Sequence, residues 1–186
     1  MSVVPLGLLR LFCCHGHQRV GRGSGSRKPY CLSPTASPQT QGDSDAELRF
    51  HALLDQAARA AGAPVEVLEA VNVTLPPGLV MPDLAVTDAG ATVEDTVSVD
   101  ADAVQFVIEL VSPGNKTMDR KFKPLLYAEA AIAHFWRLEF DPAPRLIVSE
   151  LHAGRYVETT TALAGATTRI HAPFPVDIDP AGLTRQ

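Results

Sequence analysis

The chain has 186 residues, of which 46% are hydrophobic and 20% are charged, a composition typical of a soluble globular protein. No apolar stretch reaches the roughly 20 residues that a membrane-spanning helix needs, so we expect no membrane association. The net charge of −5 hides an asymmetry: residues 1–42 carry five basic residues and no acidic one, whereas residues 43–186 carry 11 basic and 21 acidic residues. An acidic body argues against tight non-specific DNA binding, because contacts to phosphates dominate such affinity.

The first 42 residues differ from the rest of the chain. Residues 21–42 are rich in Gly, Ser, Pro and Thr, so they bury too little apolar surface to offset the entropy lost on ordering. All three cysteines lie within residues 1–42, so residues 43–186 have no cysteine-based site, which suits a reducing cytoplasm. We therefore predict a disordered or atypical N-terminal extension at residues 1–42, a single domain at residues 43–186, and a cytoplasmic location.

The first predicted element of the domain is a helix over residues 45–62, where Leu48 and other apolar residues recur near helical spacing. A β-branched, partly alternating run follows at residues 65–75 and reads as a strand. A turn containing two prolines and a glycine leads into a second strand over residues 80–87. A loop rich in acidic residues then spans about residues 88–102.

The second half of the domain predicts one buried strand, one helix and several further strands. Residues 104–111 form a nearly continuous apolar run, interrupted only by Gln105 and Glu109, which is typical of a strand buried on both faces. A helix is expected over residues 119–132. Further strands are expected at residues 135–138, 145–148, 156–160 and 168–170. The sum is a mixed β-sheet flanked by helices, of the α/β or α+β class.

Two carboxylates stand within these apolar strands. Glu109 lies inside the run Val-Ile-Glu-Leu-Val, where burying its charge is costly unless a partner or a metal ion compensates. The alternative is that Glu109 faces the solvated side of a sheet, but its apolar neighbours on both sides favour a functional role. Asp83 follows Pro82 at the entry of the preceding strand, a position that is also common in turns. Together, carboxylates on adjacent strands are able to bind Mg²⁺, which prefers oxygen ligands and retains reactive waters.

A basic cluster follows the second carboxylate and consists of Lys116, Arg120, Lys121 and Lys123. Surface lysines are usually only solvated, so the cluster gains its significance from the carboxylates before it. A lysine beside such a pair is able to position water or to stabilise charge that develops on a phosphate. Lys116 and Arg120 are the candidates for direct phosphate contacts.

The order of these residues resembles the Uma-type putative restriction endonucleases, a bacterial family of the PD-(D/E)XK nuclease superfamily. The resemblance covers roughly residues 48–180. It rests on Pro82-Asp83, Val107-Ile108-Glu109-Leu110-Val111-Ser112-Pro113, Asp119-Arg120, Lys123-x-x-x-Tyr127 and Phe135-Trp136. The resemblance implies a restriction-endonuclease-like α/β core, Mg²⁺ or Mn²⁺ as the cofactor, and DNA as the substrate. Nucleases of this class often act as homodimers, and the exposed edges of a mixed sheet would allow that arrangement here.

By position, the resemblance implies that Asp83 and Glu109 are the metal ligands. The superfamily's usual lysine stands two residues after the glutamate, where this chain has Val111. The family's pattern instead points to Lys123 on the following helix.

The residue after this lysine complicates the assignment. Pro124 disfavours a helical conformation at Lys123, although proline is tolerated in a first helical turn. The second helix is therefore able to begin at Pro124 and leave Lys123 at its edge, in which case Lys121 becomes the substitute. Tyr127 and Trp136 match family positions that we expect to pack rather than to react.

The leading hypothesis is a metal-dependent endonuclease that hydrolyses DNA phosphodiester bonds with Asp83, Glu109 and Lys123 or Lys121. The competing hypothesis is a catalytically inactive interaction or nucleic-acid-binding module on the same fold. The acidic body favours this alternative. So does the composition of residues 1–42, which lack the acidic N-terminal hairpin that is usual in family members.

Overall fold

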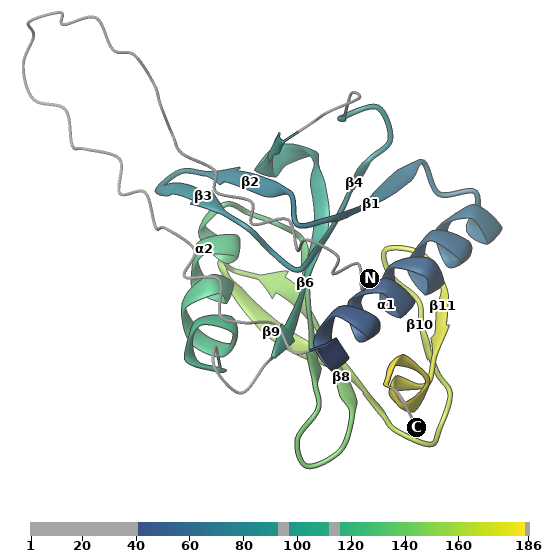
Figure 1. Ribbon diagram of the computed structural model, residues 1–186. Helices are drawn as coiled ribbons and strands as arrows, with labels where there is room; N and C mark the ends of the chain where they lie inside the picture. Colours follow the sequence, from purple (N-terminus) through teal and green to yellow (C-terminus); the bar gives the residue numbers. More distant parts are fainter. Residues whose placement is uncertain (1–40, 93–96, 112–115, 185–186) are drawn as a thin grey trace, which may run out of the picture.

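The computed structural model describes residues 41–92, 97–111 and 116–184 (Figure 1). Apart from its last two residues, the predicted extension at residues 1–42 lies outside the described residues. So does the predicted turn at residues 112–115. Within the part of the chain that is described, no helix combines the length and the apolarity needed to cross a membrane.

A six-stranded sheet in the order β1-β4-β6-β7-β8-β9 forms the centre of the structure (Figure 1). Its strands are β1 (Val65–Glu69), β4 (Leu84–Asp88), β6 (Val104–Val111), β7 (His134–Glu139), β8 (Arg145–His152) and β9 (Arg155–Leu163). Strands β6 and β7 run parallel, and each of the other neighbouring pairs is antiparallel. The predicted mixed sheet flanked by helices is confirmed.

Two smaller sheets correct the predicted strand boundaries. A three-stranded sheet contains β2 (Asn72–Leu75), β3 (Gly78–Val80) and β5 (Ser98–Asp100), and a two-stranded sheet contains β10 (Thr168–Ile170) and β11 (Val176–Ile178). The single strand predicted over residues 65–75 is wrong, because the chain breaks at Ala70 (φ 49°) and its halves join different sheets. The strand predicted over residues 80–87 is likewise divided between β3 and β4. Two short 3₁₀ helices complete the fold, η1 (Ala101–Ala103) and η3 (Pro180–Leu183).

Helix α1 (Gln41–Ala61) covers one face of the central sheet together with β10, β11 and η3. Its buried face repeats every fourth residue: Ala46, Phe50, Leu54 and Ala58. The expectation that Leu48 belongs to this face is wrong, since Leu48 is 64% exposed. The aromatic rings on the sheet match this helix face: Trp136 stacks on Phe50 and makes a tilted contact with Phe106. The helix stops, as predicted, at Gly62, whose φ of 64° favours glycine.

The second helix, α2 (Lys123–Glu129), lies on the opposite face and is preceded by a π-helical turn, η2 (Met118–Phe122). Every residue of β6 except Gln105 is buried, so the prediction of a strand covered on both faces is confirmed. Its side chains alternate between the two layers. Phe106, Ile108 and Leu110 join the α1 core, whereas Val107 joins the α2 core. Glu109 therefore shares the α2 face.

The α1 core gives a direct test of this layering. Phe50→Ala removes a fully buried ring from the helix–sheet contact, and we expect it to lower the free energy of unfolding by about 3–5 kcal/mol. Leu48→Ala on the same helix is the matched control and should change stability by less than about 0.5 kcal/mol. Urea denaturation followed by circular dichroism measures both. Equal losses in the two variants would contradict the assigned helix face.

Candidate active site

Strands β4 and β6 bring the two predicted carboxylates together. Leu84 of β4 pairs with Ile108 of β6, and Asp83 precedes β4 directly, so continuation of the antiparallel register places Asp83 opposite Glu109. The backbone N–H of Leu110 donates to Asp83 Oδ2 at 2.6 Å. Burial raises the pKa of Glu109, and the charge of Asp83 also acts on Glu109 and raises that pKa. Glu109 is fully buried, as expected for a carboxylate inside an apolar strand.

Lys123 supplies the cation of this cluster. Its Nζ lies 2.5 Å from Glu109 Oε2 and 3.2 Å from Asp119 Oδ1, and it donates to the carbonyl oxygen of Met81 at 3.4 Å. Lys121, the alternative candidate, is exposed, and among the residues described no carboxylate lies within ion-pair distance of it. The structure therefore brings Lys123, and not Lys121, to the two carboxylates.

The local backbone explains how Lys123 reaches this position. The expectation that the helix begins at Pro124 is wrong, because helical geometry already extends through η2. Lys123 has helical angles (φ −57°, ψ −43°), and its N–H bonds to the carbonyl of Met118 five residues earlier. Such π-type turns occur mostly as single turns within α-helices, often at functional sites. Lys123 thus keeps a helical conformation that the following proline disfavours.

Two further residues of the same helix face belong to the cluster and were not predicted as site residues. Asp119 is 2% exposed and pairs with Lys123. Tyr127 is buried, and its hydroxyl donates to Glu109 Oε1 at 2.6 Å, so it contacts the site as well as packing. The spacing of Asp119, Lys123 and Tyr127, each four residues from the next, places all three on one side of a helix. That spacing was the signal available in the sequence.

Burial and mutual repulsion raise the pKa values of the carboxyl groups in this cluster. Burial raises the pKa of Glu109, of Asp83 and of Asp119 above the ordinary carboxyl range, and the charge of Lys123 opposes each increase. Burial alone would lower the pKa of Lys123, but Glu109 and Asp119 together raise it above its ordinary value. Burial, followed by the charge of Glu109, raises the pKa of Tyr127, which keeps this hydroxyl a hydrogen-bond donor. Three carboxyl groups surround one ammonium, and a divalent cation bound there would favour their ionised forms.

A fourth acidic residue approaches from the α1 side of the sheet. Glu47 is half-buried, and its pKa is raised to about 7 by burial, then by the charges of Asp83 and Glu69. Glu69 is itself paired with His51 Nδ1 at 2.6 Å. No pattern in the sequence pointed to Glu47, since a glutamate in the first turns of an amphipathic helix is ordinarily solvated. Helix α1 thus contributes an acidic side chain near Asp83.

The donor set suits a hard divalent cation. Among the described residues, no three His, Cys, Asp or Glu side chains are grouped as a ready-made metal site. Mg²⁺, however, is commonly bound by only one or two carboxylates and retains several waters. Asp83 and Glu109 would supply such a pair of oxygen ligands. The residues therefore fit Mg²⁺ or Mn²⁺.

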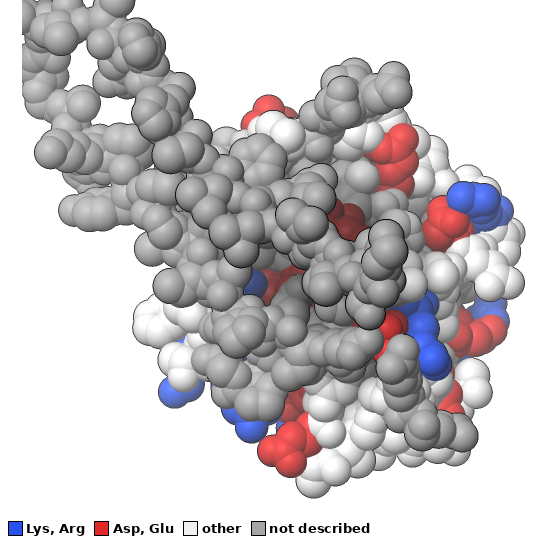
Figure 2. Space-filling model, in the orientation of Figure 1, with Lys and Arg blue, Asp and Glu red and all other residues white. Residues whose placement is uncertain are grey.

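The two residues predicted to contact phosphate are both engaged in ion pairs. Lys116 Nζ lies 3.4 Å from Asp141 Oδ2 at the surface. Arg120 makes a bidentate contact with the buried carboxylate of Glu139, at 2.9 Å for each of its two hydrogen bonds. On the face drawn in Figure 2, basic side chains lie beside acidic ones and form no continuous basic surface among the residues described.

Comparison with known proteins identifies the family and the fold. The family model described as "Uma2: Putative restriction endonuclease" matches residues 34–184. The chain belongs to this family. Among solved structures, it is similar to one described as a "putative nuclease belonging to DUF820 from Anabaena variabilis ATCC 29413". That similarity has a TM-score of 0.58 at 15% sequence identity and covers 78% of this chain and 81% of the other. The predicted family resemblance and restriction-endonuclease-like fold are confirmed, while no curated protein matches the sequence.

Removal of the ammonium tests the charge balance of the cluster. Lys123→Met leaves buried carboxylates without their cation, and we expect a loss of about 3–5 kcal/mol in unfolding free energy. The loss should be smaller at pH 5 than at pH 8, because protonated carboxyls no longer need the ammonium. Lys121→Met, two residues away and exposed, is the control and should be nearly neutral. A neutral Lys123→Met would contradict the ion-pair network.

Glu47 gives a separate pH-dependent prediction. The pKa of Glu47 in the folded state is about 7, above its ordinary value of 4.5. Between these two values the unfolded chain has already released the proton while the folded chain still holds it. The stability of the wild type therefore falls as the pH rises from 4.5 to about 7. Glu47→Gln removes that loss. We expect the variant to gain about 1 kcal/mol over wild type at pH 8, after allowance for solvent screening, and to gain nothing at pH 4. Urea unfolding at both pH values measures this. A stability difference between Glu47→Gln and wild type that did not depend on pH would contradict this prediction. The exposed Glu129→Gln variant serves as the control.

Proposed function

We propose that this member of the Uma2 family is a metal-dependent nuclease that hydrolyses DNA phosphodiester bonds. The observation that carries the proposal is the meeting of Asp83 before β4, Glu109 within β6 and Lys123 at the start of α2. Glu109 is fully buried there and contacts the ammonium. Burying a carboxylate in an apolar core costs stability, and a site that attracts a cation gives that burial a function.

Asp83 and Glu109 are the residues that would hold Mg²⁺ or Mn²⁺. When bound, such an ion polarises the scissile phosphate and lowers the pKa of an attacking water. The Leu110 N–H orients the Asp83 carboxylate, and the Tyr127 hydroxyl orients that of Glu109. Both contacts fix these oxygens before substrate arrives, which spares reorganisation during the reaction.

Lys123 and Glu47 have complementary roles in this proposal. Lys123 stays protonated because Glu109 and Asp119 raise its pKa, so its ammonium is available to stabilise negative charge that develops on a phosphate. Glu47 has a pKa of about 7 beside Asp83, a value matched to accepting a proton near neutral pH. Its carboxylate is therefore proposed as the group that takes a proton from water.

A second candidate is a catalytically inactive module on the same fold. It is favoured by one observation: the ammonium of Lys123 already neutralises part of the carboxylate charge from within the chain, between Glu109 and Asp119. In that case the ion pairs stabilise the fold, and metal is not required. The two candidates differ in whether DNA is cleaved when Mg²⁺ or Mn²⁺ is added.

Cleavage of supercoiled plasmid DNA in Mg²⁺ or Mn²⁺ tests the proposal. We expect wild type to cleave, and Asp83→Asn and Glu109→Gln each to reduce the rate about 100-fold or more, because each removes a ligand charge. Asp88→Asn, at the exposed far end of β4, is the matched control and should retain the wild-type rate.

Thermal melting must show that each variant is folded. Loss of cleavage in the control as well would point to a contaminating or surface-dependent activity. Retained cleavage in folded Asp83→Asn and Glu109→Gln proteins would reject the assigned ligands.

A further inference from the structure

A second charged cluster lies on the α2 face of the sheet, next to the carboxylate site. Its centre is Glu139, the last residue of β7, which is only 2% exposed. Three arginines contact this one carboxylate: Arg120 through two hydrogen bonds at 2.9 Å, Arg145 at 2.5 and 3.2 Å, and Arg137 with Nε at 2.8 Å. Burial would raise the pKa of Glu139, but Arg145, Arg120 and Arg137 hold it below its ordinary value.

The arginines outnumber the negative charge they surround. One carboxylate offsets one of three guanidinium charges, and the remaining described partner, Glu158, is 61% exposed and 3.6 Å from Arg137. Arg145 and Arg120 keep 39% and 35% of their side chains exposed, so the cluster is open to solvent. A solvent-accessible surplus of guanidinium groups within an acidic domain favours an anion.

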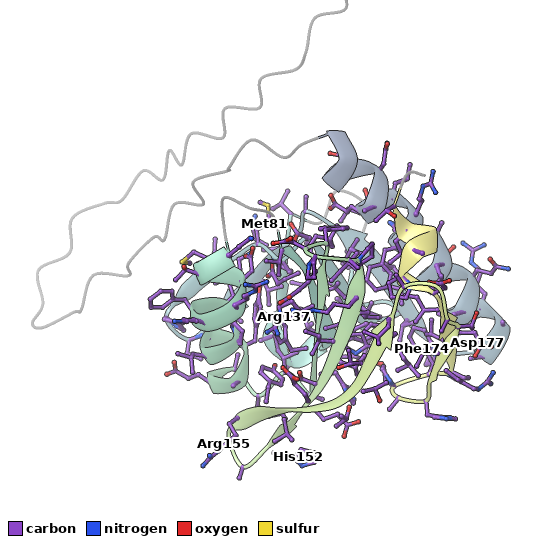
Figure 3. The ribbon with its side chains drawn as sticks, turned by 90° about the horizontal axis from the view of Figure 1, so that it is seen from below. Met81, Arg137, His152, Arg155, Phe174 and Asp177 are labelled. Carbon is purple, nitrogen blue, oxygen red and sulfur yellow. The ribbon has the colours of Figure 1, made fainter. Side chains whose placement is uncertain are left out.

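Arg137 also carries an unsatisfied donor. Its Nε is buried, and although Glu139 Oε1 lies close, the described residues offer this N–H no acceptor in hydrogen-bond alignment. Buried donors without an acceptor are rare in native proteins, and each calls for an explanation. The Nε itself is out of reach of solvent, so an anion with several oxygens, bound in front of the cluster, would accept from the outer N–H groups of these guanidiniums. Figure 3 shows Arg137 within the side-chain layer of the sheet rather than at its outer rim.

The fold joins this cluster to the carboxylate site. Arg137 of β7 is the register partner of Glu109 on β6, so the two positions are about one strand spacing (~4.8 Å) apart and on the same face. The consecutive residues Asp119 and Arg120 of η2 contact different clusters. Asp119 pairs with Lys123 of the carboxylate site, and Arg120 pairs with Glu139 of the arginine cluster. An anion held by the arginines would therefore lie beside any phosphate held at the carboxylates.

We propose that Arg137 and Arg145, fixed in place by Glu139, bind a phosphate group of the DNA strand next to the phosphate that is cleaved. This rests on the proposed nuclease function, which supplies the ligand class. The planar fork of arginine matches phosphate oxygens in pairs, and Glu139 holds two such forks in fixed orientations. Glu139 is thus a positioning residue, and the strand is held in register with Asp83 and Glu109.

Binding of a fluorescent single-stranded DNA oligonucleotide to the full-length protein tests the proposal. The assay contains EDTA, so that no cleavage occurs, and the salt concentration is varied. We expect Arg145→Gln to weaken binding about tenfold and to reduce the salt dependence by about one phosphate contact. Arg145→Lys keeps the charge but loses the fork, so it should keep the salt dependence while losing affinity.

Arg155→Gln is the matched control. Arg155 is exposed at the tip of the β8–β9 hairpin, away from Arg137 (Figure 3), and pairs with no acidic side chain among the described residues. This variant should bind DNA like wild type. If Arg145→Gln binds as tightly as wild type with the same salt dependence, the site is refuted. A wild type that binds no oligonucleotide at low salt also refutes it. If Arg145→Gln is unfolded by thermal melting, the folded Arg145→Lys variant decides the question through its affinity.

Oligonucleotides with and without a 5′-phosphate identify the source of the group. An effect of Arg145→Gln on both supports an internal phosphodiester, and an effect on the phosphorylated form alone supports a terminal phosphate. Failure of the function and failure of this site are distinguishable. Arg145-dependent binding without cleavage would reject catalysis but keep the site, whereas cleavage and binding unaffected by Arg145→Gln would reject the site alone.

Discussion

The contact between the Lys123 ammonium and the carboxylates of Glu109 and Asp119 is the interaction on which the candidate site depends. Glu109 stands in the middle of a buried strand, where an ionised carboxylate is costly unless a cation or hydrogen bonds compensate. Lys123 and Tyr127 supply those partners from one helix face. The compensation is incomplete, because Asp83 and Asp119 add charge that one ammonium does not balance. Buried ion pairs of this kind contribute little net stability, so their retention is better explained by binding or catalysis.

The strand pairing of the central sheet brings charged side chains together on one face. The antiparallel pairing of β4 and β6 sets Asp83 opposite Glu109, and the parallel pairing of β6 and β7 sets Arg137 beside it. The turn η2 then lays its consecutive residues over the two clusters. Negative and positive surpluses thus lie side by side on one face of the sheet. This arrangement suits a polyanion held together with a divalent cation, and the acidic surface of the domain need not contribute to binding.

Much of this could be predicted from the sequence, and the reasons for the rest are physical. The β6 strand and Glu109 were predictable because a run that is apolar on both sides of a carboxylate indicates a buried strand, and burial makes that carboxylate costly unless it is compensated. The break at Ala70 was not, since a β-branched run on both sides reads as one strand and only tertiary pairing divides it. The helical state of Lys123 was missed because the proline rule is a local preference that the π-turn and the ion pairs override. Glu139 was missed because its arginine partners lie on three elements, η2, β7 and β8, and only the folded sheet directs them toward one carboxylate.

Cation binding at Asp83 and Glu109 is the central claim, and calorimetric titration of the full-length protein with Mn²⁺ at pH 8 tests it most directly. We expect saturable Mn²⁺ binding in the wild type and its loss in Glu109→Gln. The control variant Glu129→Gln, at an exposed position of α2, should bind Mn²⁺ like the wild type. Folding of each variant is verified by thermal melting. Absence of binding in folded wild type, or undiminished binding in Glu109→Gln, would contradict the account. The carboxylates would then serve only the ion pairs that hold α2 to the sheet.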